Sequence, residues 1–261
     1  MPELPDVESF RRYLEATALH QPIGDLQVSD DYVLTDVTEK ELQKSLVSTS
    51  FETTVRHGKN LFVRTDGPKW LRLHFGMTGF LKYFKHLEDR PTHERMLVSF
   101  ENGYHLGYVC QRKLGEVGLA DSPQESAEKR GLGPQALKVG PEEFLELLRR
   151  NRGMLKIGLM DQGFLAGIGN IYADEILFQC RLHPATGADS LDEEMRVRMF
   201  EVTKRVLQTA VDCSADIPRM PDCFLLPHRA EGEECPRCGT GLVREKVGQR
   251  SAYYCPSCQS E

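Results

Sequence analysis

The sequence predicts an α+β protein with strands in its first half, helices in its second half and a small cysteine-bearing unit at its end. Three observations indicate this class. Apolar and polar residues alternate between about 20 and 120, apolar spacing becomes helical beyond about 140, and two Cys-x-x-Cys pairs lie within roughly the last 30 residues. At 261 residues the chain is long enough for one large domain or two medium ones.

The first half begins with a helix and continues as strands. Apolar residues at helical spacing over residues 7–14 predict an amphipathic helix at the N-terminus. Leu71, Leu73 and Phe75 alternate with polar neighbours, so they are expected to face one side of a sheet. Asn102-Gly103 between two apolar runs predicts a hairpin.

The stretch from Asp121 to Pro134 is polar and interrupted by Gly and Pro, with no apolar period, which predicts a linker over 121–140. A helix is expected after Pro141. Another is expected to begin at Ser190, where Glu193 completes a capping box.

A turn is predicted at Gly167-Ile168-Gly169, with Asn170 as the N-cap of the next helix and two acidic residues in its first turn. The free N–H groups at such a helix start form a site for an anion, and Asn170 could extend it. Lys156, one helix earlier, could cover the same phosphate. A plain turn is the alternative.

The cysteines divide into two groups. Cys110, Cys180, Cys213 and Cys223 are scattered and are expected to be packed thiols. The pairs Cys235/Cys238 and Cys255/Cys258 are separated by sixteen residues, a spacing typical of a tetrahedral zinc ribbon. Because all four positions would be thiolates, the single Zn²⁺ is expected to be structural rather than catalytic; an unmetallated or redox pair is the alternative.

Charge and hydropathy exclude several classes of protein. The net charge of −6 argues against a surface that binds nucleic acid throughout, although basic residues cluster over 56–72 and 149–156. No run of apolar residues is long enough for a membrane span, and the charged first 20 residues are unlike a signal peptide. A cytoplasmic, nucleoid-associated location without membrane contact is expected.

The chain opens Met1-Pro2-Glu3. Removal of Met1 would leave a secondary amine beside a carboxylic acid. An α-amine titrates at roughly 7.7 to 8.0, far below lysine, so a usable fraction is an unprotonated nucleophile at neutral pH. This pair is a candidate catalytic centre.

Taken together, these motifs resemble the formamidopyrimidine-DNA glycosylase/endonuclease VIII family of base-excision repair enzymes. The resemblance spans nearly the whole chain. The matching segments are residues 1–8 (MPELPDVE), 56–59 (RHGK), 73–79 (LHFGMTG), 132–134 (LGP), 159–162 (LMDQ), 166–178 (AGIGNIYADEILF) and the terminal ribbon with Arg250.

The resemblance implies an N-terminal helix on a two-sheet β-sandwich (residues 1–120), the linker (121–140), a helix-two-turn-helix domain (141–228) and a zinc-ribbon hairpin (229–261). It implies a bifunctional glycosylase/abasic-site lyase that acts as a monomer on damaged double-stranded DNA. The alternative is a catalytically silent damaged-DNA-binding protein of the same fold. A transcription or translation factor is disfavoured by the opening motif.

The family's catalytic roles fall on four residues of this chain. Pro2 would attack C1′ of an extruded nucleotide and form a Schiff base, with Glu3 as general acid/base. Lys59 would contact phosphate and assist β-elimination, and Arg250 would serve δ-elimination.

Seven further positions match DNA-contacting residues of the family. Lys156 and Asn170 match phosphate ligands, and His74 and Arg95 match positions along or near the backbone. The others address the bases: Met77 would fill the gap left by the flipped base, Arg112 would address its partner, and Leu114 would wedge into the opposite strand.

Three departures bear on which lesion is excised. Cys110-Gln111-Arg112-Lys113-Leu114-Gly115 replaces Asp-Pro-Arg-Arg-Phe-Gly, so the aromatic wedge becomes a leucine. The segment 213–234 is too short for the loop that caps 8-oxoguanine. Asp6 replaces a glutamate, and Asn151 stands where a lysine is common. Ring-opened purines, oxidised pyrimidines or abasic sites are therefore expected to be handled better than 8-oxoguanine.

Overall fold

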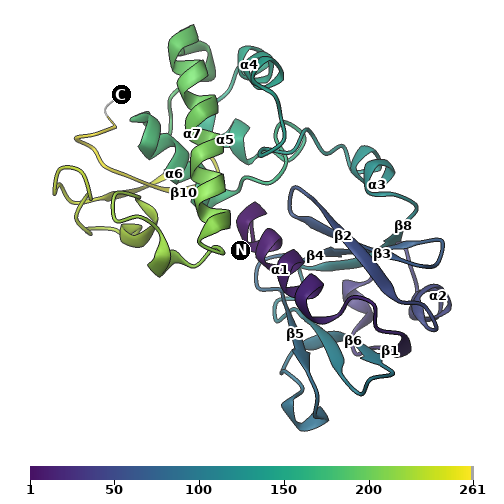
Figure 1. Cartoon of the computed structure of the whole chain (residues 1–261). Coiled ribbons are helices and arrows are strands. Elements are labelled where there is room, and N and C mark those ends of the chain that lie inside the picture. Colours follow the sequence, from purple (N-terminus) through teal and green to yellow (C-terminus); the bar gives the residue numbers. More distant parts are fainter. Residues whose placement is uncertain (260–261) are drawn as a thin grey trace. The chain divides into compact units, whose positions relative to one another are not determined.

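A computed structural model describes residues 1–259 and divides them into two compact units (Figure 1). The strand-rich unit comprises residues 1–2 and 6–130, and the helical unit comprises residues 3–5 and the chain from Gly131 onward. Residues 3–5 therefore group with the second half of the chain. Helix α1 (Leu4–Thr17) begins within this segment, and its remaining residues belong to the strand-rich unit.

Two four-stranded antiparallel sheets form the strand-rich unit. One has the order β1-β6-β7-β5, and its strands are Ile23–Val28, Glu94–Phe100, His105–Val109 and Phe80–Phe84. The other has the order β2-β3-β4-β8, and its strands are Phe51–His57, Asn60–Thr65, Trp70–His74 and Glu116–Ala120.

One apolar core joins the two sheets and α1, as a sandwich requires. Leu71 and Leu73 of β4 are fully buried in it, as their alternation predicts, and Phe75 follows directly after the strand. Gly103, with φ +80°, turns β6 into β7, which confirms the predicted hairpin. Arg72 is also buried, because its guanidinium donates to Asn60 and Glu116.

Two short helices lie where the sequence predicted none. Helix α2 (Glu39–Leu46) has Thr38 as N-cap within a capping box. Helix α3 (Pro123–Lys129) lies inside the segment predicted to be a linker, with Ser122 as N-cap and Pro123 in its first turn. Only Pro123 and Ala127 of α3 are buried, and so few apolar contacts produce no period that the sequence could show.

The helical unit contains four helices and a terminal hairpin. The helices are α4 (Pro141–Arg150), α5 (Leu155–Met160), α6 (Asn170–Cys180) and α7 (Glu193–Asp212), and the hairpin strands are β9 (Val243–Val247) and β10 (Arg250–Tyr254). Five 3₁₀ turns complete the elements of residues 1–259: η1 (Asp31–Val33), η2 (Leu87–Asp89), η3 (Ala188–Ser190), η4 (Ile217–Arg219) and η5 (Leu226–His228). The predicted α+β class is confirmed.

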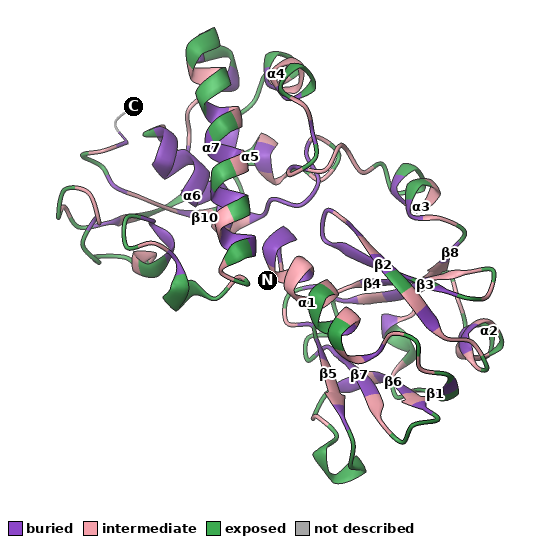
Figure 2. Ribbon diagram, viewed as in Figure 1, coloured by how far each residue is buried: buried purple, intermediate pink, exposed green. Residues whose placement is uncertain are grey.

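Helix α6 is the centre of this unit. Nine of its eleven residues are buried, and Figure 2 shows it purple along its length, whereas α7 alternates between buried and exposed residues. The acidic residues Asp174 and Glu175, predicted for its first turn, lie in the second and are both fully buried. A helix enclosed on all sides shows no amphipathic stripe, so its termini are its only sequence signal.

Two predicted helix starts need correction. Gly169, not Asn170, is the N-cap of α6, and Asn170 is its first residue. Helix α7 begins at Glu193 with Asp192 as N-cap, whose side chain accepts from the Met195 N–H. Ser190 instead donates its hydroxyl to the Gly187 carbonyl oxygen within η3. Asp192 sits two residues closer to the helix than Ser190 and so takes the cap position.

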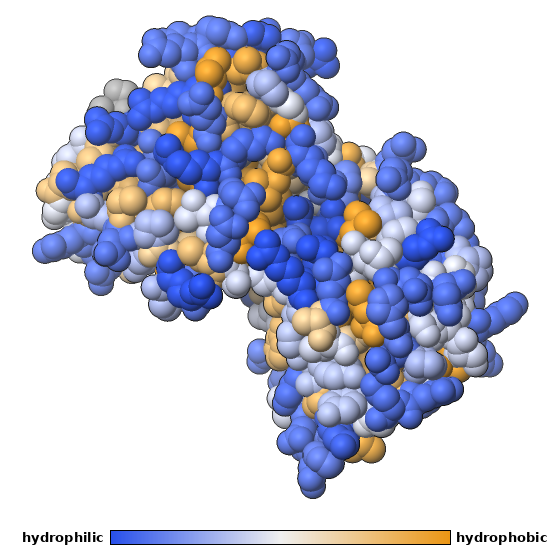
Figure 3. All heavy atoms as spheres, viewed as in Figure 1, coloured by the Kyte–Doolittle hydropathy of each residue, from blue (hydrophilic) through white to orange (hydrophobic). Residues whose placement is uncertain are grey.

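The surface agrees with the composition. On the face that Figure 3 shows, most side chains are hydrophilic, with hydrophobic residues scattered among them. None of the helices formed by residues 1–259 has the length and apolar character needed to cross a bilayer.

Candidate active site

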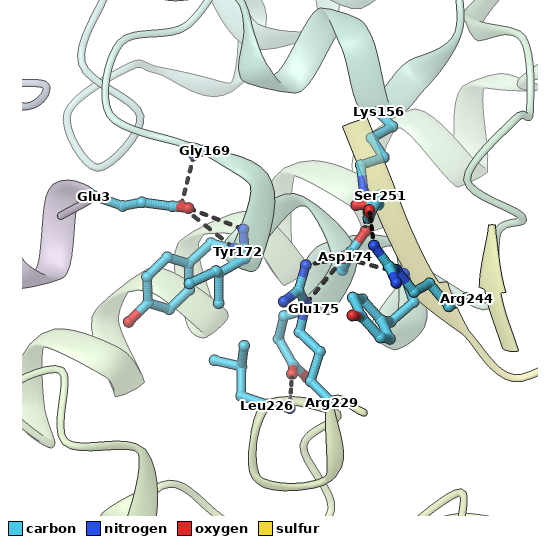
Figure 4. Close-up of polar contacts among 12 residues, drawn as sticks. Glu3, Lys156, Gly169, Tyr172, Asp174, Glu175, Leu226, Arg229, Arg244 and Ser251 are labelled. Carbon is cyan, nitrogen blue, oxygen red and sulfur yellow. Dashed lines mark hydrogen bonds and ion pairs between the residues drawn. The ribbon is translucent and has the colours of Figure 1, made fainter. Parts of the chain in front are cut away.

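Glu3 lies at the N-terminus of α6 (Figure 4). Its carboxylate accepts hydrogen bonds from the Gly169 N–H at 2.6 Å and the Ile171 N–H at 2.9 Å, with a longer one from Tyr172 at 3.4 Å. Only 1% of the residue is exposed. An ionised carboxylate is an acceptor-only group, and the positive end of the helix dipole favours it. Glu3 is thus fixed in position.

This arrangement corrects the prediction that the helix start is free to bind phosphate. The N–H groups of Gly169 and Ile171 are already bonded to Glu3. The glycine turn has a different purpose: Gly167 has φ +121°, and a Cβ there would lie 2.6 Å from Leu4 Cδ1. The Leu4 N–H also donates to the Gly167 carbonyl oxygen at 3.0 Å. The turn therefore receives the N-terminal segment of the chain.

Pro2 is covalently attached to this anchored residue. Met1 is 42% exposed and Pro2 is half-buried. While Met1 is attached, the Pro2 nitrogen is a tertiary amide without nucleophilicity. Removal of Met1 turns the same nitrogen into a secondary amine one residue from the Glu3 carboxylate.

Lys59 sits in the tight turn between β2 and β3, where Gly58 adopts φ +55°. Arg56 braces this turn: its Nη1 donates to the Gly58 carbonyl oxygen at 3.1 Å and its Nε donates to Glu8 of α1 at 3.0 Å. Arg56 and Lys59 are both buried. Glu8 and Arg56 stand inside the segments on which the family resemblance rests, but no sequence pattern indicates that they pair.

His74 ends β4 and is neutral at physiological pH. Burial lowers its pKa to about 4, and although Glu116 opposes this, Arg72 and Lys59 act in the same direction as burial. Its Nδ1 accepts from the Gly76 N–H at 3.3 Å, which places the proton on Nε2. His74 can therefore donate a hydrogen bond to a phosphate oxygen but carries no charge to attract it.

Two loops bring together the residues predicted to address the bases. Met77 lies in the loop after β4 and is 37% exposed, and Leu114 lies in the loop after β7 and is 50% exposed. The loops touch at Gly76, where a Cβ would lie 2.3 Å from the Leu114 carbonyl oxygen. The Arg112 N–H also donates to Thr78 Oγ1 at 3.2 Å. The loops that carry these three side chains therefore form one packed unit.

Arg95 supports the loop after β7, which carries Arg112 and Leu114. Its Nε donates to the Cys110 carbonyl oxygen at 3.0 Å, and its Nη1 lies 3.4 Å from Asp30. Asp30 also pairs with Lys113 at 2.5 Å, which lowers the pKa of the Asp30 carboxyl. In this structure Arg95 thus holds protein backbone rather than presenting its whole guanidinium to a ligand.

Lys156 differs most from its prediction. Its side chain is fully buried, and Nζ contacts Asp174 Oδ1 at 2.5 Å and the Ser251 carbonyl oxygen at 2.9 Å (Figure 4). Burial lowers the pKa of Lys156 and raises that of Asp174, while their mutual attraction opposes both shifts. In this structure the Lys156 ammonium is covered and has two protein partners, and its phosphate contact stays a prediction.

Asn170 remains suited to its predicted role. It is half-buried, and its Oδ1 atom is buried without a hydrogen-bond partner among residues 1–259. An unsatisfied buried amide oxygen costs free energy unless a ligand or water satisfies it. That oxygen suits a water or another hydrogen-bond donor, whereas a phosphate, which only accepts, would bond to the Asn170 Nδ2 group.

The four predicted metal ligands converge. Their Sγ atoms lie within 4.8 Å of one another, and individual pairs measure 3.5 Å (Cys238–Cys255) and 3.9 Å (Cys235–Cys258). Tetrahedral zinc with Zn–S bonds of 2.3 Å requires sulfur pairs about 3.8 Å apart. The cluster fits one structural Zn²⁺ and is the only group of three or more metal-ligating side chains within residues 1–259.

Arg250 begins β10 directly after the tight turn at Gly248 and pairs with Val247 across the hairpin. It is exposed, and its side chain makes no hydrogen bond or ion pair within residues 1–259. The hairpin thus presents this guanidinium outward. Asp174 and Arg229, which hold β10 in place, had no identifying signal in the sequence, because their partners lie 18 to 79 residues away.

Three family models match the chain. The formamidopyrimidine-DNA glycosylase N-terminal domain matches residues 1–117, the H2TH domain of the same enzymes matches 131–221, and the zinc finger found in FPG and IleRS matches 232–260. The zinc-finger match agrees with the cysteine geometry, and the H2TH match agrees with the predicted helix-two-turn-helix domain.

Whole-chain comparisons agree. A Synechocystis protein named formamidopyrimidine-DNA glycosylase is 34% identical over 99% of this chain and 98% of its own length. A protein of the same name from Pelotomaculum thermopropionicum is 32% identical over 99% of both. The crystal structure of the Lactococcus lactis Fpg with DNA containing N7-benzyl-Fapy-dG has a TM-score of 0.90 at 27% identity over 100% of both chains. The complex of the L. lactis protein with abasic-site DNA gives the same TM-score.

Proposed function

The chain belongs to the formamidopyrimidine-DNA glycosylase family, a family of base-excision repair enzymes with abasic-site lyase activity, and from this premise we propose how its residues divide the reaction. The Pro2 amine, once Met1 is removed, attacks C1′ of an extruded nucleotide and displaces the damaged base, which leaves a Schiff base. The observation that carries the proposal is the anchoring of Glu3, because it fixes the neighbouring nitrogen in space.

Glu3 is the group that moves protons at the sugar. Fixed next to the Pro2 nitrogen by its bonds to the α6 N-terminus, Glu3 accepts the proton that the attacking amine loses and then gives it to the opening sugar ring oxygen. The displaced base leaves with the electron pair of the C1′–N bond and takes a proton from water. Its fixed position supplies the orientation that such a transfer requires.

The iminium formed on Pro2 acidifies the C2′ proton, and loss of that proton allows the 3′-phosphate to leave. Lys59 contacts phosphate and assists this β-elimination from its braced turn. In δ-elimination the C4′ proton leaves, a C4′–C5′ double bond forms and the C5′–O bond breaks to release phosphate. Arg250 stabilises the charge on that leaving phosphate.

Damaged double-stranded DNA is the partner that the remaining residues fit. His74 and Asn170 donate to phosphate, while Met77, Arg112 and Leu114 occupy the gap and contact the opposite strand. The chain acts as a monomer at the nucleoid. The catalytically silent alternative has no support, since Pro2, Glu3 and Lys59 are all present.

Lesion choice follows from the short segment 213–234. Its residues 224–226 are buried, and Glu175 accepts from the Leu226 N–H at 2.9 Å while Gln179 donates to the Cys223 carbonyl oxygen at 3.3 Å. A segment pinned in this way has little spare length to cover 8-oxoguanine, and Leu114 stacks less well on a base than an aromatic side chain does. Both features favour ring-opened purines, oxidised pyrimidines and abasic sites.

A panel of duplexes, each with one lesion, tests this choice: purine lesions lie opposite cytosine, and pyrimidine lesions lie opposite their normal purine partner. We expect kcat/KM on a ring-opened purine or an oxidised pyrimidine to exceed that on 8-oxoguanine by about tenfold, the scale of one lost stacking contact of 1–3 kcal/mol. An undamaged duplex is the control. Comparable kcat/KM on 8-oxoguanine would refute the lesion assignment, and the absence of cleavage of every lesion would refute the enzyme itself.

A further inference from the structure

We infer that Asp174, Lys156 and Arg229 form a buried ionic clamp that positions Arg250 for the second elimination, an inference that rests on the proposed function. Asp174 is fully buried in α6. Its carboxylate accepts from Lys156 at 2.5 Å and from Arg229 Nη2 at 2.7 Å and Nε at 3.0 Å (Figure 4). One acidic residue thus joins two cations from different segments.

The clamp holds the strand that carries Arg250. Asp174 also accepts from the Tyr253 N–H at 3.2 Å, and Lys156 donates to the Ser251 carbonyl oxygen at 2.9 Å. Residues 251 and 253 present their backbone groups to the same edge of β10, the edge that β9 does not pair. The charged side chains therefore take the place of a third strand.

Arg229, the third member of the clamp, contacts the same strand through the side chain of Tyr253. The Arg229 guanidinium lies 4.5 Å from the centre of the Tyr253 ring, in addition to its bond to Asp174. Arg250 directly precedes Ser251 in β10. The clamp therefore fixes the backbone position from which the Arg250 guanidinium projects. Arg250 itself makes no such contacts within residues 1–259, so its position depends on its strand.

The clamp residues do not reach the reacting atoms: Asp174 and Lys156 are fully covered, and their donors and acceptors point at one another and at β10. They are positioning residues. Their loss should affect the step that needs Arg250 and spare the step that needs only Pro2 and Glu3.

Asp174→Asn tests this with an abasic duplex. Borohydride trapping measures the Schiff base, and a denaturing gel separates the β-elimination product from the β,δ-elimination product. We expect trapping close to wild type and a δ-product fraction reduced by about tenfold, since small misplacements of a catalytic group cost rate steeply. Glu94→Gln is the matched control, because Glu94 is a buried, ion-paired acid of the strand-rich unit that bonds to Arg90 and Ser29. Its product ratio should remain that of the wild type.

Asp174→Asn leaves two cations without their anion and could fail to fold. The double variant Lys156→Met/Asp174→Asn removes both members of the fully buried pair. It should show the same reduced δ-product fraction as Asp174→Asn and should still bind one zinc ion. An unchanged δ fraction in a folded, zinc-loaded variant would overturn the inference. So would a parallel fall of trapping and δ product. Wild-type protein that traps nothing would instead refute the proposed function.

Discussion

Glu3→Gln is expected to lower excision of an intact lesion by about 10² to 10⁴-fold, the usual contribution of a general acid–base group. The amide cannot accept the proton of the attacking amine, and its NH₂ group would face the Gly169 and Ile171 N–H groups that now bond to the carboxylate. Single-turnover excision measures the effect. Trapping on a preformed abasic site should fall less, because its open aldehyde needs no protonation of the ring oxygen.

Glu15→Gln provides the comparison for Glu3→Gln. Glu15 lies on α1, the helix that begins directly after Glu3, and is partly exposed. It bonds to Arg11 and Thr54, both in the strand-rich unit. It should excise at the wild-type rate. A Glu3→Gln protein that retained both its thermal stability and full excision would exclude Glu3 as the proton-transfer group.

Zinc removal is the second change with a large expected effect. Cys235 and Cys255 belong to a small buried cluster with Phe178, Leu225 and Leu242. Such a cluster is too small to fold the hairpin without metal, since structural zinc contributes about 10–16 kcal/mol in comparable small ribbons. Cys258→Ser or strong chelation should therefore abolish δ-elimination and weaken DNA binding, while the strand-rich unit stays folded.

The measurement combines zinc stoichiometry, circular dichroism and product analysis on an abasic duplex. Cys223→Ser is the control, because Cys223 is an exposed thiol outside the cluster and its loss should change none of the three. Normal δ-elimination by a protein that holds no zinc would contradict the assignment of the ribbon to that step.

The features that the sequence predicted well are those set by local spacing. Two Cys-x-x-Cys pairs specify a ribbon, Asn102-Gly103 specifies a hairpin, and Leu71 and Leu73 specify a buried strand face. In each case the physical cause lies within a few residues of the signal. The short helix α3 was missed because its few buried residues leave no period.

The interactions that could not be predicted are those between distant residues. The Glu3 carboxylate bonds to the Gly169 N–H, 166 residues away, so a helix start that looked free for phosphate is already occupied. Lys156 stands in a basic segment and matches a phosphate ligand of the family, yet it is buried and paired with Asp174, which is buried as well. The sequence alone does not show whether a charged side chain is exposed or paired, because its neighbours in space are not known.

The central claim is that the N-terminal proline nitrogen is the nucleophile, and mapping the trapped adduct tests it most directly. Protein lacking Met1 is reduced with borohydride on an abasic duplex, digested and analysed by mass spectrometry, beside protein in which Met1 is retained. We expect an adduct on the Pro2 nitrogen of the first protein and none on the second, whose nitrogen is an amide. An adduct on Lys59, or equal trapping by the protein that keeps Met1, would contradict it.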